Sequence, residues 1–267
     1  MYADDTVIYV HGKQKDIIEK LLQEDLQQIA SYFDENELII NLKKGKTETM
    51  IFGTAKRLFY TEQHLDISFK GQKINNVTEY KYLGNIVDQN LNFNENFEKV
   101  YKKASGRLRL LKKLRYYLTV EAAQHIFTMM ILPIITYRGP VKLHYNNTQQ
   151  ARLRSLENRA KHVIGKTVPN IINSIRKEAI ILVKKSVENK TCRNFIGYFK
   201  INQHTKATRN NGYLITLPKV KLEIGKQTFM YSGAKLFNDL PLQTRKIESI
   251  LLLEKDLRKL FDLNTNY

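Results

Sequence analysis

Cysteine is nearly missing from this sequence, and its scarcity excludes several classes of protein. Cys192 is the only one, so the chain cannot form an intramolecular disulfide or a cysteine-rich zinc site. No two of the six histidines are four residues apart, which is the spacing that lets one helix face present two metal ligands. A dedicated metalloprotein is therefore not expected.

Long apolar runs and a signal sequence are missing as well. The most apolar run, residues 126–137, is interrupted by Pro133 and suits a buried helix, whereas a membrane span needs about 20 residues. The N-terminus is acidic and polar, whereas a secretory signal begins basic and then becomes apolar. We expect an intracellular protein of the nucleus or cytoplasm, neither secreted nor placed in a membrane.

Acidic residues become scarce after residue 53. Residues 1–53 carry 6 Lys/Arg and 10 Asp/Glu, whereas residues 54–267 carry 38 and 16, and the whole chain has a net charge of +18. A basic body of this kind favours a polyanionic partner such as nucleic acid. The alternative is a basic surface that has no partner.

The first fifty residues are typical of a strand, a helix and two further strands. Strands are expected over residues 6–10, 38–42 and 47–52. Apolar residues three and four apart predict a helix between the first two of these strands, with Asp16 as its N-cap. The apolar stripe of this helix is Ile18, Leu22, Leu26, Ile29 and Phe33.

Glycines mark two further β segments. Residues 67–74 predict a hairpin around Gly71. Residues 80–87 predict one more strand, with Gly84 at a bend or a close approach of the backbone.

The pattern becomes helical after residue 93. An apolar face extends from Phe97 to Leu114, and a boundary near residue 95 separates the mixed part from the helical part. Thr119 is expected to cap a helix that stops before Pro133, and Thr148 to cap another. A last helix is expected over residues 249–261, whereas residues 190–235 show no clean periodicity.

Asp4 and Asp5 are the first candidates for a functional site. Nucleotidyl transfer uses two Mg²⁺ ions, and the octahedral oxygen ligands that Mg²⁺ requires come from more than one segment of a chain. Two adjacent aspartates at the tip of a strand turn supply half of such a site. The alternative is a turn with two solvated acids.

Several blocks occur together in one order. The string YADDTVIY is followed by the helix, then by INLKKGKTETMIFG and YKYLG. This order resembles the second half of a reverse transcriptase of non-LTR (LINE-type) retrotransposons, nearest the jockey-like group. The stretches KASGRLRLLKKLRYYLT, ILPIITY, LENRAKHVIG and AKLFNDLP resemble the region that follows the palm, so the resemblance covers essentially the whole chain.

The resemblance implies roles for particular residues. In that family the first block is motif C of the palm, where both aspartates, here Asp4 and Asp5, bind catalytic Mg²⁺ or Mn²⁺. YKYLG matches the motif E primer grip, which points to Tyr82 and Gly84. Motif D supplies a lysine near the leaving pyrophosphate, and Lys46 is the best match, although a solvated basic turn is the alternative.

The implied fold is α+β. A palm remnant (1–94, motifs C, D and E) is followed by a helical thumb-like region (95–165) and a C-terminal extension (166–267). The implied function is a fragment of an RNA-directed DNA polymerase, with an RNA template and a DNA primer as partners. Incoming dNTP is expected only if the missing half is supplied.

One departure from the family affects the mechanism. Its motif A, which supplies another metal-binding aspartate, and its fingers lie upstream of motif C, but this chain begins at Met1. We therefore expect an internal start within a truncated element, an incomplete metal site and no activity of the chain alone. Two alternatives stay open, namely a non-catalytic, sequence-independent RNA- or DNA-binding remnant and the product of a decayed element without function.

The sequence GKT occurs at 45–47 and again at 165–167, but neither copy predicts a P-loop. Such a loop needs a glycine five residues before the first glycine of the motif, and those positions hold Ile40 and Ala160.

The strongest physical signal lies between residues 99 and 115, which include eight Lys/Arg and no acid. These cations can lie opposite the apolar face and meet phosphates without reading bases. Tyr116 and Tyr117, which follow, are either base-stacking or core residues, and the core interpretation is favoured. The candidate binding residues are Lys99, Lys102, Lys103, Arg109, Lys112 and Lys113.

Overall fold

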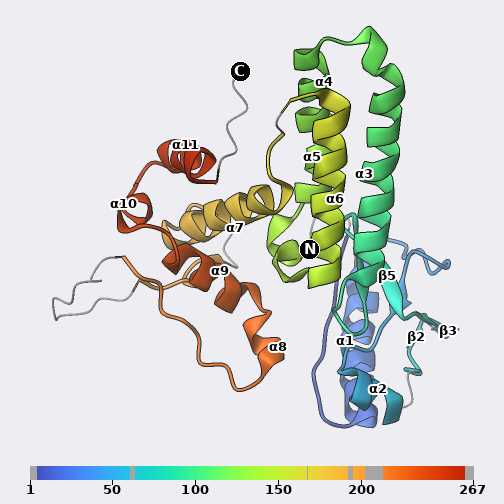
Figure 1. Cartoon of the computed structure of the whole chain (residues 1–267). Coiled ribbons are helices and arrows are strands. Elements are labelled where there is room, and N and C mark those ends of the chain that lie inside the picture. Colours follow the sequence, from blue (N-terminus) through green and yellow to red (C-terminus); the bar gives the residue numbers. More distant parts are fainter. Residues whose placement is uncertain (1–4, 61–63, 167, 192–194, 202–212, 262–267) are drawn as a thin grey trace, which may run out of the picture. The chain divides into compact units, whose positions relative to one another are not determined.

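The computed structural model describes residues 5–60, 64–166, 168–191, 195–201 and 213–261 (Figure 1). The chain divides into two compact units, residues 1–99 and 100–267. The described residues belong to a mixed class in which helices dominate and the strands are few and short. The three ranges 1–94, 95–165 and 166–267 stay predictions.

The first unit combines one long helix with very short strands. The helices are α1 (Lys15–Glu35) and α2 (Ala55–Tyr60). The strands form three two-stranded sheets, of which β1–β4 is parallel and the other two are antiparallel. They are β1 (Glu48–Thr49), β2 (Ser68–Phe69), β3 (Gln72–Lys73), β4 (Asn75–Asn76), β5 (Glu79–Tyr82) and β6 (Asn85–Asp88).

An extended segment lies on α1 to form the core of this unit. Leu65, Ile67 and Phe69 alternate along the segment and are buried with Leu26 of α1. Side-chain amides extend the hydrogen bonding where the strands are short. The Gln23 side chain of α1 donates to the Ser68 carbonyl oxygen (2.8 Å) and accepts from the Ser68 N–H (3.1 Å), as a neighbouring strand would.

Two of the expected strands do not form. Residues 6–10 and 38–42 have no strand structure, and Tyr9 and Ile39 are 84% and 96% exposed. A β-branched or aromatic sequence forms a strand only where a neighbouring chain and a packing surface are available. The expected strand over 47–52 shrinks to β1, which pairs with β4 over two residues.

Residues with positive φ determine where the chain reverses in the two remaining β segments. The expected hairpin around Gly71 is confirmed, because β2 and β3 pair across Lys70 and Gly71, both of which have positive φ. Residues 80–87, expected as one strand, form the hairpin β5–β6 instead. Leu83 and Gly84 have φ values of 47° and 87°, so they reverse the chain rather than bend it.

The expected N-cap of the first helix is also wrong. The helix begins one residue before Asp16, and its N-cap is Gln14, which makes no side-chain capping bond. Asp16 lies in the first turn, where a carboxylate is favourable to the helix dipole.

Helix α3 (Asn94–Leu114) leads from the first unit into the second. The described regular structure of the second unit is helical, apart from one isolated β-bridge between Ile201 and Ile215. In Figure 1, α3 and α6 lie beside the helical segment formed by α4, η2 and α5, whose parts follow one another end to end. The elements that follow α3 are η1 (Arg115–Tyr117), α4 (Val120–Ile126), η2 (Phe127–Ile131), α5 (Leu132–Thr136), η3 (Gly139–His144), α6 (Asn147–Ile164), α7 (Ile171–Val187), α8 (Glu223–Lys226), α9 (Phe229–Asn238), α10 (Leu242–Arg245) and α11 (Ile250–Leu260).

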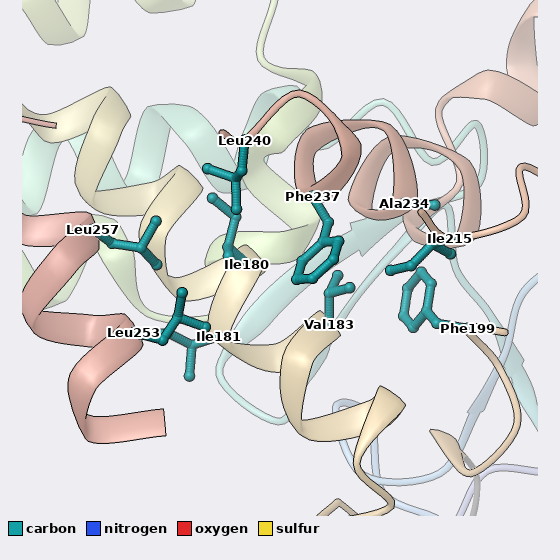
Figure 2. Close-up of a cluster of buried hydrophobic side chains, with 10 residues drawn as sticks. All are labelled: Ile180, Ile181, Val183, Phe199, Ile215, Ala234, Phe237, Leu240, Leu253 and Leu257. Carbon is teal, nitrogen blue, oxygen red and sulfur yellow. The ribbon is translucent and has the colours of Figure 1, made fainter. Parts of the chain in front are cut away.

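The second unit has a distinct hydrophobic cluster around α7, which packs against α9 and α11. Figure 2 shows Ile180, Ile181 and Val183 of α7 facing side chains of both helices. Among the described residues, no helix is both long enough and apolar enough to cross a membrane.

The helix that was expected to stop before Pro133 continues through it. Between α4 and α5 the backbone adopts one π-helical turn, at whose end the Leu132 N–H donates to the Phe127 carbonyl oxygen. Pro133, which has no N–H, therefore falls in the first turn of α5, where proline is tolerated. The Met130 carbonyl oxygen accepts a hydrogen bond from Arg107 of α3 (2.8 Å).

Of the two helix caps expected in the second unit, one is confirmed. Thr119 accepts from the Ala122 N–H at the start of α4. The last helix begins where it was expected, and Ser249 is its N-cap. The expected cap Thr148 is wrong, because Asn146 and Gln149 form a reciprocal capping box at the start of α6. Asparagine and a glutamine three residues later satisfy two helix N–H groups together, which a single threonine cannot do.

Candidate nucleic-acid interface

Of the two candidate metal-binding aspartates, the structure describes only one. Asp4 lies outside the described residues, and Asp5 is exposed. Over the described part of the chain, no three His, Cys, Asp or Glu side chains form a group that could hold a metal ion. The Mg²⁺ or Mn²⁺ site that the family resemblance implies therefore stays a prediction.

Asp5 nevertheless lies in the same neighbourhood as the turn that contains Lys46. Burial raises the pKa of the Tyr80 hydroxyl above its ordinary value, and the negative charges of Glu48 and Asp5 raise that pKa further. The same hydroxyl donates to the Lys46 carbonyl oxygen (2.8 Å). The carboxylates of Glu48 and Asp5 and the turn that contains Lys46 therefore all lie near the Tyr80 hydroxyl.

The turn itself is organised by Asn41 and Glu48. The Asn41 side chain accepts from the Lys43 N–H (3.1 Å), and its backbone carbonyl accepts from the Thr47 hydroxyl (2.9 Å). Glu48 accepts from the Gly45 N–H (2.7 Å). The Lys46 side chain is exposed. A catalytic role for this lysine stays a prediction.

Tyr82 and Gly84 lie at the β5–β6 turn. Tyr82 is half-buried at the end of β5, and Gly84 is exposed with a left-handed backbone conformation. The turn therefore places the exposed backbone of Gly84 close to the aromatic ring of Tyr82. The primer-grip role implied by the resemblance is a prediction for both residues.

The cationic face of α3 is the clearest feature of the site. We use this name for Lys99, Lys102, Lys103, Arg109, Lys112 and Lys113, all of which are exposed. None of the six makes an ion pair with a carboxylate in the part of the chain that is described. On the opposite side of the helix, Phe97, Ala104, Leu108 and Leu111 are at most 3% exposed. The expected apolar face is not buried to its end, because Leu114 is 44% exposed.

Helix geometry places most of these cations in one row. At 100° per residue, Lys102, Arg109 and Lys113 lie within about 40° of one another, and Lys99 and Lys103 lie beside them. Lys112 follows Leu108 by four residues and therefore lies at the border of the apolar stripe. The expectation that the cations lie opposite the stripe is met by five of the six.

Two arginines of α6 fix α3 to that helix. The Arg152 guanidinium lies over the Tyr101 ring, 4.3 Å from its centroid. Arg159 donates to the Ser105 hydroxyl (3.0 Å), so both pairs join α3 to α6. Because these contacts use the sides of α3, the cationic face is held in place without being covered by them.

Tyr116 and Tyr117 follow the cationic face in η1. The interpretation as core residues is wrong for both, because they are 91% and 79% exposed. Their rings meet edge to face, with centroids 5.4 Å apart and planes at 90°. An exposed aromatic pair next to unpaired cations is the combination that single-stranded nucleic acids use.

Gly106 was not singled out from the sequence. It lies within the row of cations, four residues after Lys102 and three before Arg109, and a Cβ added there would meet nothing within 4 Å. A glycine in the middle of a helix destabilises it relative to alanine. The sequence feature that could have identified Gly106 is a glycine, which disfavours a helix, at the centre of a run of basic residues. The structure shows that packing does not require a glycine there.

Models of protein families, curated protein sequences and solved structures were compared with the chain, and none of them matches it. The resemblance to a reverse transcriptase therefore stays a prediction that rests on the quoted motifs.

Proposed function

We propose that this chain binds nucleic acid through the cationic face of α3 and does so without reading base sequence. The observation that carries the proposal is a helix that buries an apolar stripe on one side and presents exposed, unpaired Lys/Arg on the other. By the motif resemblance, the face belongs to the thumb-like part of a protein similar to jockey-like reverse transcriptases. Its ligands are then an RNA template and a DNA primer.

Electrostatics supports a polyanion as the ligand. Cations three and four residues apart on one helix repel one another by a few tenths of a kcal/mol per pair. Phosphate groups remove this repulsion and release condensed counterions into the solvent, which favours binding at low salt. Contacts to phosphates carry no base information, so affinity depends on charge and salt far more than on sequence.

A salt titration tests the proposal. Binding of a labelled single-stranded oligonucleotide is followed by fluorescence anisotropy at several salt concentrations. Contact with about four to six phosphates gives log affinity falling with log salt at a slope of roughly 3–5 in magnitude. The triple reversal Lys102→Glu, Arg109→Glu and Lys113→Glu should weaken binding to every sequence equally and flatten the slope by roughly 2–3.

The matched control reverses three other exposed lysines of the same unit, namely Lys219, Lys246 and Lys255. Both triple variants change the net charge equally, so only the position of the charges differs. Equal loss of affinity in the two variants would show that overall charge, and not the cationic face of α3, binds the ligand. Circular dichroism checks that both variants keep their helices.

The catalytic part of the resemblance is proposed separately. Asp4 and Asp5 would bind divalent metal, but the described residues bring no group of three metal-binding side chains together. Two-metal transfer needs ligands from more than one segment, so we expect no nucleotide incorporation by this chain on a primed RNA template with Mg²⁺ or Mn²⁺. Incorporation that disappears in Asp5→Asn would contradict this expectation.

A further inference from the structure

The turn that follows α3 presents two aromatic rings to solvent. Tyr116 and Tyr117 are the most exposed adjacent aromatic residues of the second unit among those described, at 91% and 79%. Single exposed aromatic residues are common on protein surfaces, but two in contact form a continuous apolar patch. The rings touch each other edge to face at 5.4 Å, so one ring steadies the other and both keep a free surface.

The turn is held by hydrogen bonds within itself and to the end of α6. The Arg115 guanidinium donates to the Leu118 carbonyl oxygen (2.7 Å) and to the Ile164 carbonyl oxygen at the end of α6 (3.2 Å). The Thr119 cap then starts α4. The backbone that carries the two rings is therefore held before any ligand arrives, which reduces the entropy lost on binding.

Charge distinguishes a nucleic acid from an apolar partner. Lys112 and Lys113 precede Tyr116 and Tyr117 by four residues each, and both are exposed and unpaired among the described residues. A ligand that covers the rings also lies beside these two ammonium groups. A strand of nucleic acid offers a phosphate and a base in every nucleotide, which matches cations followed by aromatic rings.

We propose that Tyr116 and Tyr117 form a stacking site for unpaired bases, so that the preferred ligand is single-stranded nucleic acid. The inference rests on the proposed binding by the cationic face of α3 and adds the ligand class. Bases in a closed duplex stack on one another and expose only their edges, so they cannot cover the rings. Stacking tolerates every base, which agrees with binding that does not read sequence.

The first unit offers a matched control. Phe59 and Tyr60 of α2 are 80% and 77% exposed and meet edge to face at 5.2 Å. This pair has the same exposure and geometry as the proposed site but lies outside the cationic face of α3. Its removal controls for the loss of exposed aromatic surface as such.

The experiment uses the whole chain and three probes of equal length and label, namely an oligo-dT 20-mer, an abasic 20-mer with the same phosphates, and a blunt duplex. The chain contains no tryptophan, so Tyr117→Trp introduces a single tryptophan, whose fluorescence can be excited without that of the tyrosines. The oligo-dT probe should quench this fluorophore, whereas the abasic probe should not. Tyr116→Ala with Tyr117→Ala should weaken oligo-dT binding roughly tenfold or more.

Three comparisons decide the outcome. The alanine pair should leave the affinity for the abasic probe and the salt slope unchanged, and Tyr116→Phe with Tyr117→Phe should bind oligo-dT like the wild type. Equal affinities of wild type and alanine pair for oligo-dT would overturn the stacking site but leave the cationic face of α3 intact. Equal losses in the Phe59→Ala, Tyr60→Ala control would overturn the assignment to this turn. Failure of the wild type to bind any of the three probes would overturn the proposed function itself.

Discussion

The two units of the chain differ in charge as much as in secondary structure. Residues 1–99 carry 12 Lys/Arg and 16 Asp/Glu, whereas residues 100–267 carry 32 and 10. The first unit is therefore weakly acidic, and the second holds all of the positive excess. A polyanion is therefore attracted to the second unit, which contains all residues of the cationic face of α3 except Lys99, and not to the acidic surroundings of Asp5.

The units are also stabilised differently. In the first, side-chain amides replace missing strand partners, as Gln23 does at Ser68 and Asn76 does at Leu65. In the second, helices bury apolar faces around α7 and also bury the Lys184 side chain, which pairs with the partly exposed Glu188. Substitutions in the second unit should therefore cause the larger losses of stability.

The largest loss is expected at Glu188. Lys184 of α7 is completely buried, and its ammonium group is 3.0 Å from a Glu188 carboxylate oxygen. Glu188→Gln removes the counter-charge and leaves the ammonium group with neutral partners, namely the glutamine amide oxygen and Tyr213, whose hydroxyl is 3.4 Å and whose ring centroid is 4.8 Å away. The free energy of unfolding should therefore fall by about 3 kcal/mol. Urea unfolding followed by far-UV circular dichroism measures the change.

The exposed pair Glu223–Lys226 supplies the control for Glu188. Glu223→Gln should cause no measurable change, because water screens an exposed ion pair. Adding Lys184→Met to Glu188→Gln should recover most of the loss, since a buried apolar side chain needs no counter-ion. A loss in Glu188→Gln no larger than in Glu223→Gln would show that water reaches the Lys184 ammonium.

The pH dependence of the second unit should reflect Lys142. This lysine is 3% exposed, its ammonium group donates to the Ile135 carbonyl oxygen at 2.7 Å, and burial lowers its pKa from 10.5 to about 8. Between these two pH values the unfolded chain holds the proton that the folded chain has released, so stability rises with pH. From pH 8 to 10 the gain is about 2 kcal/mol.

Lys142→Met isolates this contribution, because the other lysines of the chain titrate equally in both proteins. The wild type should gain stability relative to the variant as the pH rises from 8 to 10 in urea unfolding experiments. Parallel curves for the two proteins would place the pKa of Lys142 near its ordinary value in the fold.

Asn76 tests whether the first unit depends on its amides. Its side chain donates to the Leu65 carbonyl oxygen (2.9 Å) and accepts from the Leu65 N–H (2.8 Å). Asn76→Ala should lower the stability of this unit by about 1.5 kcal/mol, since both partly buried backbone groups lose their partner. Hydrogen exchange should speed up over residues 64–76 and stay unchanged in α7, whereas the exposed neighbour Asn75→Ala should change neither.

Local chemistry made part of this structure predictable from sequence. The Gly71 hairpin, the Thr119 cap and the buried stripe of α3 follow from turn preference, capping and helical period, all of which act between residues close in the chain. Residues 6–10 and 38–42 have strand sequences but no strand, because a strand depends on partners that are distant in sequence. The exposure of Tyr116 and Tyr117 depended on where the α3–α4 connection turns, which periodicity does not reveal.

The smallest effect, and the one that links stability to binding, is expected at Gly106. Its added Cβ would meet open space, so Gly106→Ala should stabilise α3 by about 0.5–1 kcal/mol through the lower entropy of the unfolded chain. The same methyl group lies between Lys102 and Arg109 on the cationic face of α3, where a phosphate backbone can approach the helix closely only if the position is a glycine. Affinity for the oligo-dT probe should therefore fall about twofold in Gly106→Ala and further in Gly106→Leu, even though thermal unfolding shows α3 to be more stable. Binding that strengthens together with helix stability would mean that the ligand touches only the ends of the long lysine and arginine side chains and never reaches the backbone of α3.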